Sequence, residues 1–426
     1  MITLNITADM DQKLIKQVKN EWRSNIWLVV ELAVISVVLW YIVDYLFVTG
    51  SVYNQPRGFD ISHCYRISTG ELLENHPDYD PDRKGEKLYQ DYEELRRRIE
   101  MRPEVESAAL SMNSTPYNGS NSGVRYLVDS ILSEGYVIHR RVSPDFPKVF
   151  RWRGMKGETP EELSEILKRG EVLVSDNLLH FSTDNPRPMT EYVGRRIVLD
   201  MDTANPVRVG ASIVPVRYND YMQGQINRTV VTGIPRSYFN VGGEFSVRVK
   251  GNMDEGFIES IMADADSQLR SGNLFITDVE SFDDIREAHQ YGTKTQIRNM
   301  IFIIGFLLVN IFLGLLGTFW FRTRQRSRDI AIRLVSGATK GDIFRLLISE
   351  GLVLLTIATP VALLADLNIA HAELNQYYEG EYLEWGRLLI CGGVTYLLIA
   401  LMIALGISIP AWRAMKIDPA VALRDE

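Results

Sequence analysis

The chain has 426 residues, a formal net charge of −8 and only two cysteines, Cys64 and Cys391. Its near-neutral mean hydropathy is an average over four apolar runs and one long polar, acidic stretch between the first two runs. An acidic chain of this kind is not expected to bind nucleic acid, and the absence of a GxxxxGK[ST] motif excludes a P-loop ATP site.

The four apolar runs predict four transmembrane helices. Each run approaches or exceeds the roughly 20 residues that cross about 30 Å of hydrocarbon as a helix. We expect these spans at residues 26–48, 296–321, 344–365 and 388–409. The first run is too long for a cleavable signal peptide and no small-residue cleavage site follows it. Residues 1–25 are therefore expected to remain as a cytoplasmic amphipathic segment.

The polar stretch at residues 49–295 is long enough to bury a core of its own. Helical spacing of apolar residues is found in Gly85–Met101, Pro160–Lys168 and Asp254–Leu269, and another helix is expected to begin at Phe282 and continue into the second span. The pattern predicts strands at "VESAALSM", "GVRYLVDS", "GYVIHRRV", "EVLVS", "RRIVLDM", "VRVGASIVPV", "RTVVTGIP", "EFSVRVK" and "NLFITDV". We therefore expect an α+β domain of two subdomains, with a strand-rich subdomain inserted in the middle.

This polar domain contains no pattern that predicts catalysis. Its histidines have neither an i, i+4 histidine partner nor cysteines at metal-ligand spacing, so we interpret each as structural or surface histidine. The loop "NSTPYNGSNSG" (Asn113–Gly123) lacks the G-x-S-x-G spacing of a nucleophile and is interpreted as mobile. "NHPDYDPDR" departs from a calcium-loop pattern. We expect no catalytic, metal or cofactor site. The chain's histidines are His63, His76, His139, His180, His289 and His371.

Polar and small residues within the spans allow two interpretations. Asn310, Gly314 and Gly317 share one face of the second span, where they predict close helix packing, either inside one protomer or between two. Glu31 and Asp44 lie away from the centre of the first span, so both are expected to reach the headgroups; an ion pathway is the alternative.

The distribution of cations predicts the orientation. The segment before the first span, the loop at residues 322–343 and the tail at residues 410–426 are rich in Lys and Arg, whereas the loop at residues 366–387 has Arg387 as its one Lys or Arg. Cytoplasmic loops carry an excess of Lys and Arg. Both termini and the 322–343 loop are thus expected in the cytoplasm, and the polar domain and the acidic 366–387 loop outside.

The loop after the second span has an unusual amount of local structure. The residues in and just before "RSRDIAIRLVSGATKGD" (Arg326–Asp342) predict a helix over Arg324–Ser336 that Gly337 terminates, followed by a capping box that starts at Thr339. Ile330 and Leu334 share one face of this helix. It is either an interfacial helix that lies on the headgroups or a stiff handle for a cytoplasmic protein.

A resemblance separates these two interpretations. "RDIAIRLVSGATKGDIFRLLISEG" closely resembles the loop between spans two and three in permeases of the MacB/FtsX-like ABC transporter family, with Asp329 in place of the usual Glu and Ala331 in place of the usual Gly. The tail "IPAWRAMKIDPAVALRDE" resembles the family's ending, and "MRPEVESAALS", "RRVSPDFPKVF", "EVLVSDNLLH" and "YVGRRIVL" resemble its periplasmic core. One span before that domain and three after it also match the family.

The resemblance implies a non-catalytic permease in the inner membrane of a bacterium, with no fused ATPase. Such a permease forms a homodimer or a heterodimer and docks a separate ABC ATPase, which binds ATP and Mg²⁺. The implied ATPase contacts are Arg328, Asp329, Ile330, Arg333 and Leu334, with a corner at Gly337 and Ala338 and a tail held by Pro410, Arg413 and Pro419.

The implied function is that of a MacB-type transporter. ATP hydrolysis would move the periplasmic domains by mechanical transmission, and that movement would drive efflux of small amphiphilic compounds or peptides, together with a periplasmic adaptor and an outer-membrane channel. The alternatives are lipoprotein release, regulation of cell-wall hydrolases, for which the polar domain is larger than usual, and a receptor that senses antimicrobial peptides.

Overall fold

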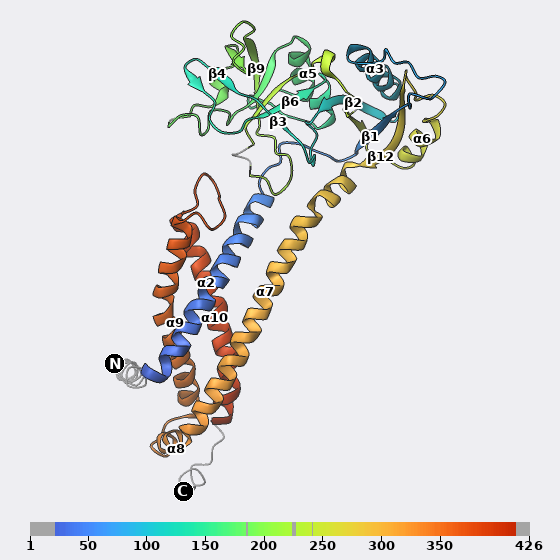
Figure 1. Ribbon diagram of the computed structural model, residues 1–426. Helices are drawn as coiled ribbons and strands as arrows, with labels where there is room; N and C mark the ends of the chain where they lie inside the picture. The colour runs from blue at the N-terminus through green and yellow to red at the C-terminus, as the bar shows by residue number, and fades with distance from the viewer. Residues whose placement is uncertain (1–21, 185, 224–226, 241, 415–426) are drawn as a thin grey trace. The chain divides into compact units, whose positions relative to one another are not determined.

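The computed structural model describes residues 22–184, 186–223, 227–240 and 242–414. Most of the predicted segment at residues 1–25, and Pro419, lie outside the described residues. The chain divides into a membrane unit, Met1–Gly50 with Thr293–Glu426, and an α+β unit, Ser51–Gly292 (Figure 1).

In the described part of the chain, four helices are long and apolar enough to cross a membrane. All four extend beyond the apolar runs at one or both ends, because a helix ends where its capping groups lie rather than where the apolar residues stop. As predicted, one uninterrupted helix runs from Phe282 into the second span. The four helices are α2 (Trp22–Tyr53), α7 (Phe282–Gln325), α9 (Lys340–His371) and α10 (Trp385–Ala414).

Small residues bring three of these helices together in the membrane unit. A Cβ atom added at Gly351 of α9 would lie 2.7 Å from side-chain atoms of Ile403 and Ile407 of α10. One added at Gly406 of α10 would lie 3.2 Å from the carbonyl oxygen of Phe312 in α7. Glycine at these two positions therefore permits the close backbone approach that stabilises helix pairs in lipid.

The α+β unit is built on one continuous path of strands. Their order is β12-β1-β11-β2-β6-β10-β7-β9-β8-β4-β5, with β3 paired to β6. Neighbours are antiparallel except for the parallel pairs β6–β10 and β7–β9. The strands are β1 (Cys64–Glu71), β2 (Val105–Met112), β3 (Ser122–Gly123), β4 (Tyr126–Val128), β5 (Ile131–Leu132), β6 (Ile138–Val142), β7 (Val172–Ser175), β8 (Arg196–Leu199), β9 (Val207–Ile213), β10 (Thr229–Gly233), β11 (Glu244–Val249) and β12 (Leu274–Ser281).

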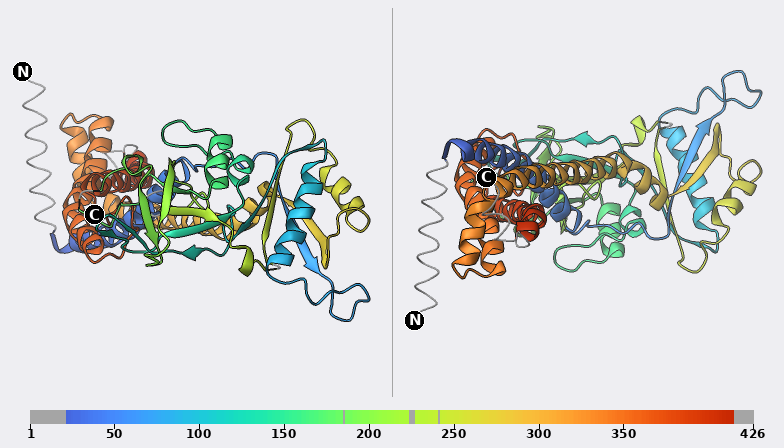
Figure 2. Two further views of the ribbon diagram at one scale, coloured as in Figure 1. Left: turned by 90° about the horizontal axis from the view of Figure 1, so that it is seen from above. Right: turned by 90° about the horizontal axis from the view of Figure 1, so that it is seen from below.

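Four helices pack on these strands: α3 (Glu86–Glu100), α4 (Phe146–Val149), α5 (Pro160–Lys168) and α6 (Phe257–Asp264). The apolar side of α3 and residues of α6 form one buried cluster with β1, β2, β11 and β12. Both helices lie at the β12–β1 end of the strand path (Figure 1 and Figure 2). Helix α5 starts at a capping box in which the Thr159 hydroxyl accepts from the Glu162 amide. Separate clusters lie around α4 and α5 and around β4, β8 and β9.

The predicted strands and helices of this unit are present, but α6 is shorter than expected, and helix α4 and strands β1 and β5 were not predicted. Helix α6 is shorter than the predicted Asp254–Leu269, since it ends at Asp264. Strand β1, which lies between β11 and β12, was not predicted. Its residues, "CYRISTGE", are largely polar beyond Ile67, and only Cys64, Tyr65 and Ile67 are buried. The pattern therefore lacks the apolar alternation that indicates a strand.

Candidate functional site

The loop after α7 forms a short helix, α8 (Ser327–Val335). It begins three residues later than predicted, because α7 continues to Gln325 and the bend lies at Arg326, whose φ and ψ are −99° and 15°. The amide of Arg326 still donates to the carbonyl oxygen of Arg322, at 3.0 Å, and its own carbonyl oxygen accepts from Ile330, also at 3.0 Å. Helices α7 and α8 are thus joined by a bend that keeps its backbone hydrogen bonds.

The other end of α8 is closed by two caps in succession. Gly337 has φ of +98°, its amide donates to the carbonyl oxygen of Leu334 at 3.2 Å, and the amide of Ala338 donates to that of Arg333 at 3.0 Å. These two bonds are the Schellman motif that ends many helices. Thr339 then caps α9 in the predicted capping box with Asp342. The corner at Gly337 and Ala338 therefore has no slack segment.

A buried ion-pair cluster attaches the first turn of α8 to α9. The carboxylate of Glu350 accepts from Arg322 at 3.0 Å and from Arg326 at 2.9 Å. The Glu350 side chain is 4% exposed, so water screens these pairs weakly, and loss of one partner of a buried pair costs about 3–5 kcal/mol. The cluster joins the end of α7, the bend and α9 at one point. The sequence showed only that Glu350 lies in the third span.

The exposed side of α8 differs from the predicted side. Ile330 is 5% exposed and belongs to the core of the membrane unit, and Leu334 packs partly against the same core. This corrects the prediction that Ile330 contacts a partner, since its side chain already fills the protein's own interior. The exposed apolar side chains are instead Ile332 (47%) and Val335 (66%). They share one face with Arg328 at spacings of i, i+4 and i+7.

We call this exposed set, Arg328, Asp329, Ile332, Arg333 and Val335, the α8 surface. All five side chains are exposed in the described part of the chain. Two aliphatic side chains next to arginines on a short fixed helix form a surface suited to a protein partner, in which a small apolar centre is surrounded by charge.

The end of α10 lies close to the end of α7. The guanidinium of Arg413 lies 4.1 Å from the centre of the Trp320 ring, a cation–π contact. Pro410 is buried within α10. Both residues therefore hold α10 in the membrane unit, whereas Pro419 lies outside the described residues.

Comparison with known proteins agrees with this geometry. Residues 301–419 match the family model "FtsX-like permease C-terminal", a match that contains α8, α9, α10 and the second half of α7. Residues 301–419 are therefore identified as an FtsX-like permease C-terminal domain. No curated protein matches the permease.

Two solved structures resemble its α+β unit weakly. The periplasmic region of MacB from Actinobacillus actinomycetemcomitans matches with a TM-score of 0.33 and 10% identity, over 56% of the permease and 97% of that chain. The extracellular domain of the noncanonic ABC-type transporter YknZ from Gram-positive bacteria matches with a TM-score of 0.28 and 9% identity, over 50% of the permease and 100% of that chain. The identification depends on residues 301–419.

The predicted packing face of α7 is exposed among the described residues, although a Cβ added at Gly314 would lie 3.5 Å from Oε1 of Glu31 in α2. Asn310, Gly314 and Gly317 are exposed, and the Asn310 amide donates to the carbonyl oxygen of Phe306 in its own helix at 2.9 Å. In the most apolar 18-residue stretch of α7 only 11% of the residues are buried, against 44% in the corresponding stretch of α2. Packing inside the protomer relies on Gly351 and Gly406 instead, and a contact of the Asn310 face with a second protomer stays a prediction.

Asp44 is enclosed by the protein, and its predicted reach to the headgroups stays a prediction. It is fully buried, its carboxylate lies 3.1 Å from Nε of Arg387, and it accepts from Asn375 at 3.3 Å. Asp366 is buried nearby, at 2% exposed. The one cation of the acidic 366–387 loop therefore pairs α10 with α2 inside the permease. Glu31, by contrast, is exposed.

Among the described residues of the α+β unit, no group of three or more His, Cys, Asp or Glu side chains could hold a metal ion. The first half of the loop predicted to be mobile, Asn113–Gly123, is held by the Glu244 carboxylate, which accepts from the amides of Ser114 at 2.8 Å and Thr115 at 3.1 Å. The loop is therefore a fixed part of the fold.

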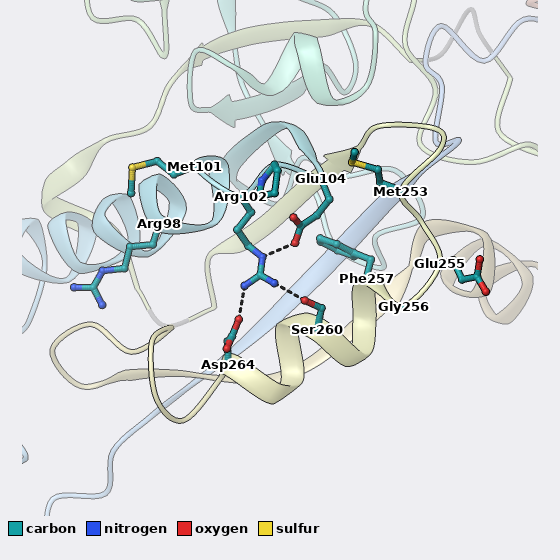
Figure 3. A pocket seen from close by; sticks show the side chains of 11 residues that line it. Arg98, Met101, Arg102, Glu104, Met253, Glu255, Gly256, Phe257, Ser260 and Asp264 are labelled. Carbon is teal, nitrogen blue, oxygen red and sulfur yellow. Dashed lines mark hydrogen bonds and ion pairs between the residues drawn. The ribbon is translucent and has the colours of Figure 1, made fainter.

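A wide pocket of about 650 Å³ lies between the end of α3 and α6 (Figure 3). Arg102 projects into it and is held by Glu104 at 2.6 Å, Asp264 at 2.7 Å and Ser260 at 2.5 Å. Because these partners already occupy the guanidinium, the cluster joins α3 to α6 and does not leave a charge free for a ligand.

Proposed function

We propose that the permease is the membrane subunit of a MacB-type ABC transporter. In this proposal a separate ATPase, which binds ATP and Mg²⁺, docks on the α8 surface, and its movements pass through the permease to the α+β unit. That transmission would drive efflux of small amphiphilic compounds or peptides. The observation that carries the proposal is an exposed apolar and basic surface on a helix that is fixed at both ends.

Fixed attachment is what a mechanical coupling requires. A docked protein that moves α8 can move α9 only if the joint between them does not bend, and the consecutive caps at Gly337 and Thr339 supply that joint. The Glu350 ion pairs supply a second joint to α7. A helix that only rested on headgroups would need neither attachment.

Charge supports the side of the membrane on which the ATPase would dock. Arg322, Arg324, Arg326, Arg328 and Arg333 cluster at the end of α7 and along α8, and such clusters mark cytoplasmic segments. In the proposed topology both termini lie in the cytoplasm and the α+β unit lies in the periplasm of a bacterium with an inner and an outer membrane. A periplasmic adaptor and an outer-membrane channel would complete the export path.

The exposed face of α7 supports assembly as a pair of permeases, either identical or related. Asn310, Gly314 and Gly317 combine an amide with two positions that lack side chains, which permits a second helix to approach closely in lipid. In a dimer of this kind each protomer would carry its own ATPase.

Replacement of Ile332 and Val335 by Asp tests the docking. The tagged permease should be purified from native membranes, and the ATP hydrolysis that purifies with it should be measured. We expect the Ile332→Asp/Val335→Asp variant to lose at least about 90% of that hydrolysis, because two charges in the apolar centre of an interface typically cost well over the 1.4 kcal/mol of a tenfold change.

The control is Met101→Asp/Met253→Asp, which changes two exposed apolar side chains of the α+β unit. It should retain the associated hydrolysis. Membrane insertion of both variants is checked by carbonate extraction. Full hydrolysis by the α8 variant in its inserted form would refute docking on this surface.

A further inference from the structure

A short segment of the α+β unit, Arg217–Met222, contacts both of the helices that continue into the membrane unit. It follows β9 in the chain. The α+β unit includes the last residues of α2, up to Tyr53, and the first residues of α7, from Phe282 to Gly292. The contacts of this segment with α2 and α7 therefore lie within the α+β unit.

Arg217 binds the end of α2. Its guanidinium is fully buried and donates to the carbonyl oxygens of Val52 at 2.7 Å and Gln55 at 2.8 Å. The carbonyl groups of a last helical turn lack partners within the helix and carry the negative end of the helix dipole. A buried guanidinium at this place therefore stabilises the helix end, and these carbonyls compensate part of the cost of its own burial.

Asp220 binds the start of α7. Its carboxylate is 1% exposed and accepts from Arg286 at 2.8 Å, from Gln290 and from the hydroxyl of Tyr117 at 3.1 Å. Arg57 lies 3.8 Å from the same carboxylate. Two donors from consecutive turns of α7 thus meet on one buried acceptor, together with a donor from the fixed loop at Asn113–Gly123.

Neighbouring residues close the connection between the two helix ends. The ring of Tyr221 lies 5.5 Å from that of Tyr53 at the end of α2, and Asn219 lies 3.3 Å from Nε2 of His289 in α7. Arg286 of α7 also donates to the hydroxyl of Tyr53 at 3.4 Å. The segment Arg217–Met222 therefore holds the end of α2 and the start of α7, and Arg286 links the two helices to each other.

We propose that Arg217 and Asp220 are positioning residues that clamp the end of α2 and the start of α7 to the α+β unit, so that the helices cannot move without moving this unit. The clamp itself follows from the contacts above. Its part in transmission rests on the proposed function.

Hydrogen exchange of the full permease in phospholipid nanodiscs, without ATPase, tests the clamp. Asp220→Asn should raise amide exchange in residues 282–292 at least about tenfold, and Arg217→Met should do so in residues 49–55, because each change breaks contacts worth more than the 1.4 kcal/mol of a tenfold shift. Arg286→Gln, a change at a side chain 27% exposed, is the milder variant if Asp220→Asn does not fold. The double variant should raise exchange in both segments, since each residue holds its own helix end.

The matched control is Arg248→Met. Arg248 is also fully buried and also binds backbone carbonyl oxygens, those of Val149 at 2.6 Å, Ser62 at 2.6 Å and Asp60 at 2.7 Å. It should raise exchange near those residues and leave both helix ends unchanged. Unchanged exchange at the helix ends in the clamp variants, or an equal increase in the control, would overturn the clamp.

A second readout tests the part in transmission. In the complex with the ATPase, Asp220→Asn should keep ATP hydrolysis while ATP no longer changes exchange in the α+β unit. A variant that still shows the ATP-dependent change would overturn this role. If instead docking on α8 fails its own test, the exchange result on the permease alone still stands, so the two failures are distinguishable.

Discussion

At the scale of single residues, the α+β unit depends on buried charged side chains that bind backbone. Arg140, Arg217 and Arg248 are fully buried, and each donates to at least two carbonyl oxygens. Burial of a charge is costly unless hydrogen bonds compensate it. These side chains therefore specify which loops lie together, and their partners are far away in the chain.

His139 of β6 predicts how this unit responds to acid. Burial, and Arg141 to a lesser degree, lower the pKa of His139 to about 4 from its ordinary value near 6.5. The unfolded chain binds a proton as the pH falls through about 6.5, whereas the folded protein does not until about pH 4. Stability should therefore be lost between these values, by up to about 3 kcal/mol.

His139→Gln should remove most of that loss, and it keeps a partner for the Thr232 hydroxyl, which lies 2.8 Å from Nε2. Denaturant unfolding of the full permease in detergent at pH 7 and pH 4.5, followed by the signal of the α+β unit, measures the difference. His76→Gln, at a more exposed histidine, serves as the control and should behave like the unchanged protein. An identical acid response with and without His139 would contradict the prediction.

The same scale shows why parts of the site could not be predicted. The capping box at Thr339 and Asp342 is local, so its spacing is visible in the sequence. Other contacts join positions that are far apart in the chain. Glu350 pairs with Arg326, 24 residues away, and with Arg322, and Arg217 binds Val52, 165 residues away. Nothing in the local pattern indicates which distant partner such a charge has.

At the scale of elements, the ends and the inward side of α8 decide how the proposed docking surface is held and exposed. The termination of α8 at Gly337 was predictable because glycine tolerates the left-handed backbone that a Schellman cap requires. The side of α8 that faces inward was not predictable. Ile330 with Leu334 and Ile332 with Val335 are both apolar pairs, and only the packing against α7, α9 and α10 selects which pair is buried. Strand β1 shows the same limit, since its place between β11 and β12 depends on pairing rather than on its own residues.

Gly337→Ala should loosen the α8 corner. A Cβ at this position meets nothing within 4 Å, so the cost is the backbone strain of φ +98°, about 1–2 kcal/mol. We expect amide exchange in residues 327–339 of the nanodisc-embedded permease to rise several-fold.

The matched control is Gly341→Ala in the first turn of α9. Its backbone is helical, and an added Cβ would lie 3.7 Å from its closest neighbour, Thr339 Oγ1. Alanine favours a helix over glycine by about 1 kcal/mol, so exchange should stay equal or decrease. Equal effects of the two substitutions would show that the left-handed cap does not hold the corner.

At the scale of the whole molecule, the permease consists of a membrane unit and an α+β unit, and α2 and α7 are the helices that belong to both. The fold class was predictable because apolar runs of spanning length and strand alternation are strong local signals. In the proposed function, force enters at α8, passes through the caps and the Glu350 ion pairs, and leaves through the Arg217–Asp220 clamp.

The most direct test of this transmission is a flexible insertion at the α8 corner. Two glycines inserted after Gly337 leave the α8 surface unchanged but separate it from α9. In the ATPase-bound complex in nanodiscs, addition of ATP should change hydrogen exchange in residues 282–292 of the unmodified permease. The insertion variant should bind the ATPase and hydrolyse ATP without that change. The same ATP-dependent change in both proteins, or none in the unmodified permease, would contradict mechanical coupling through a stiff corner.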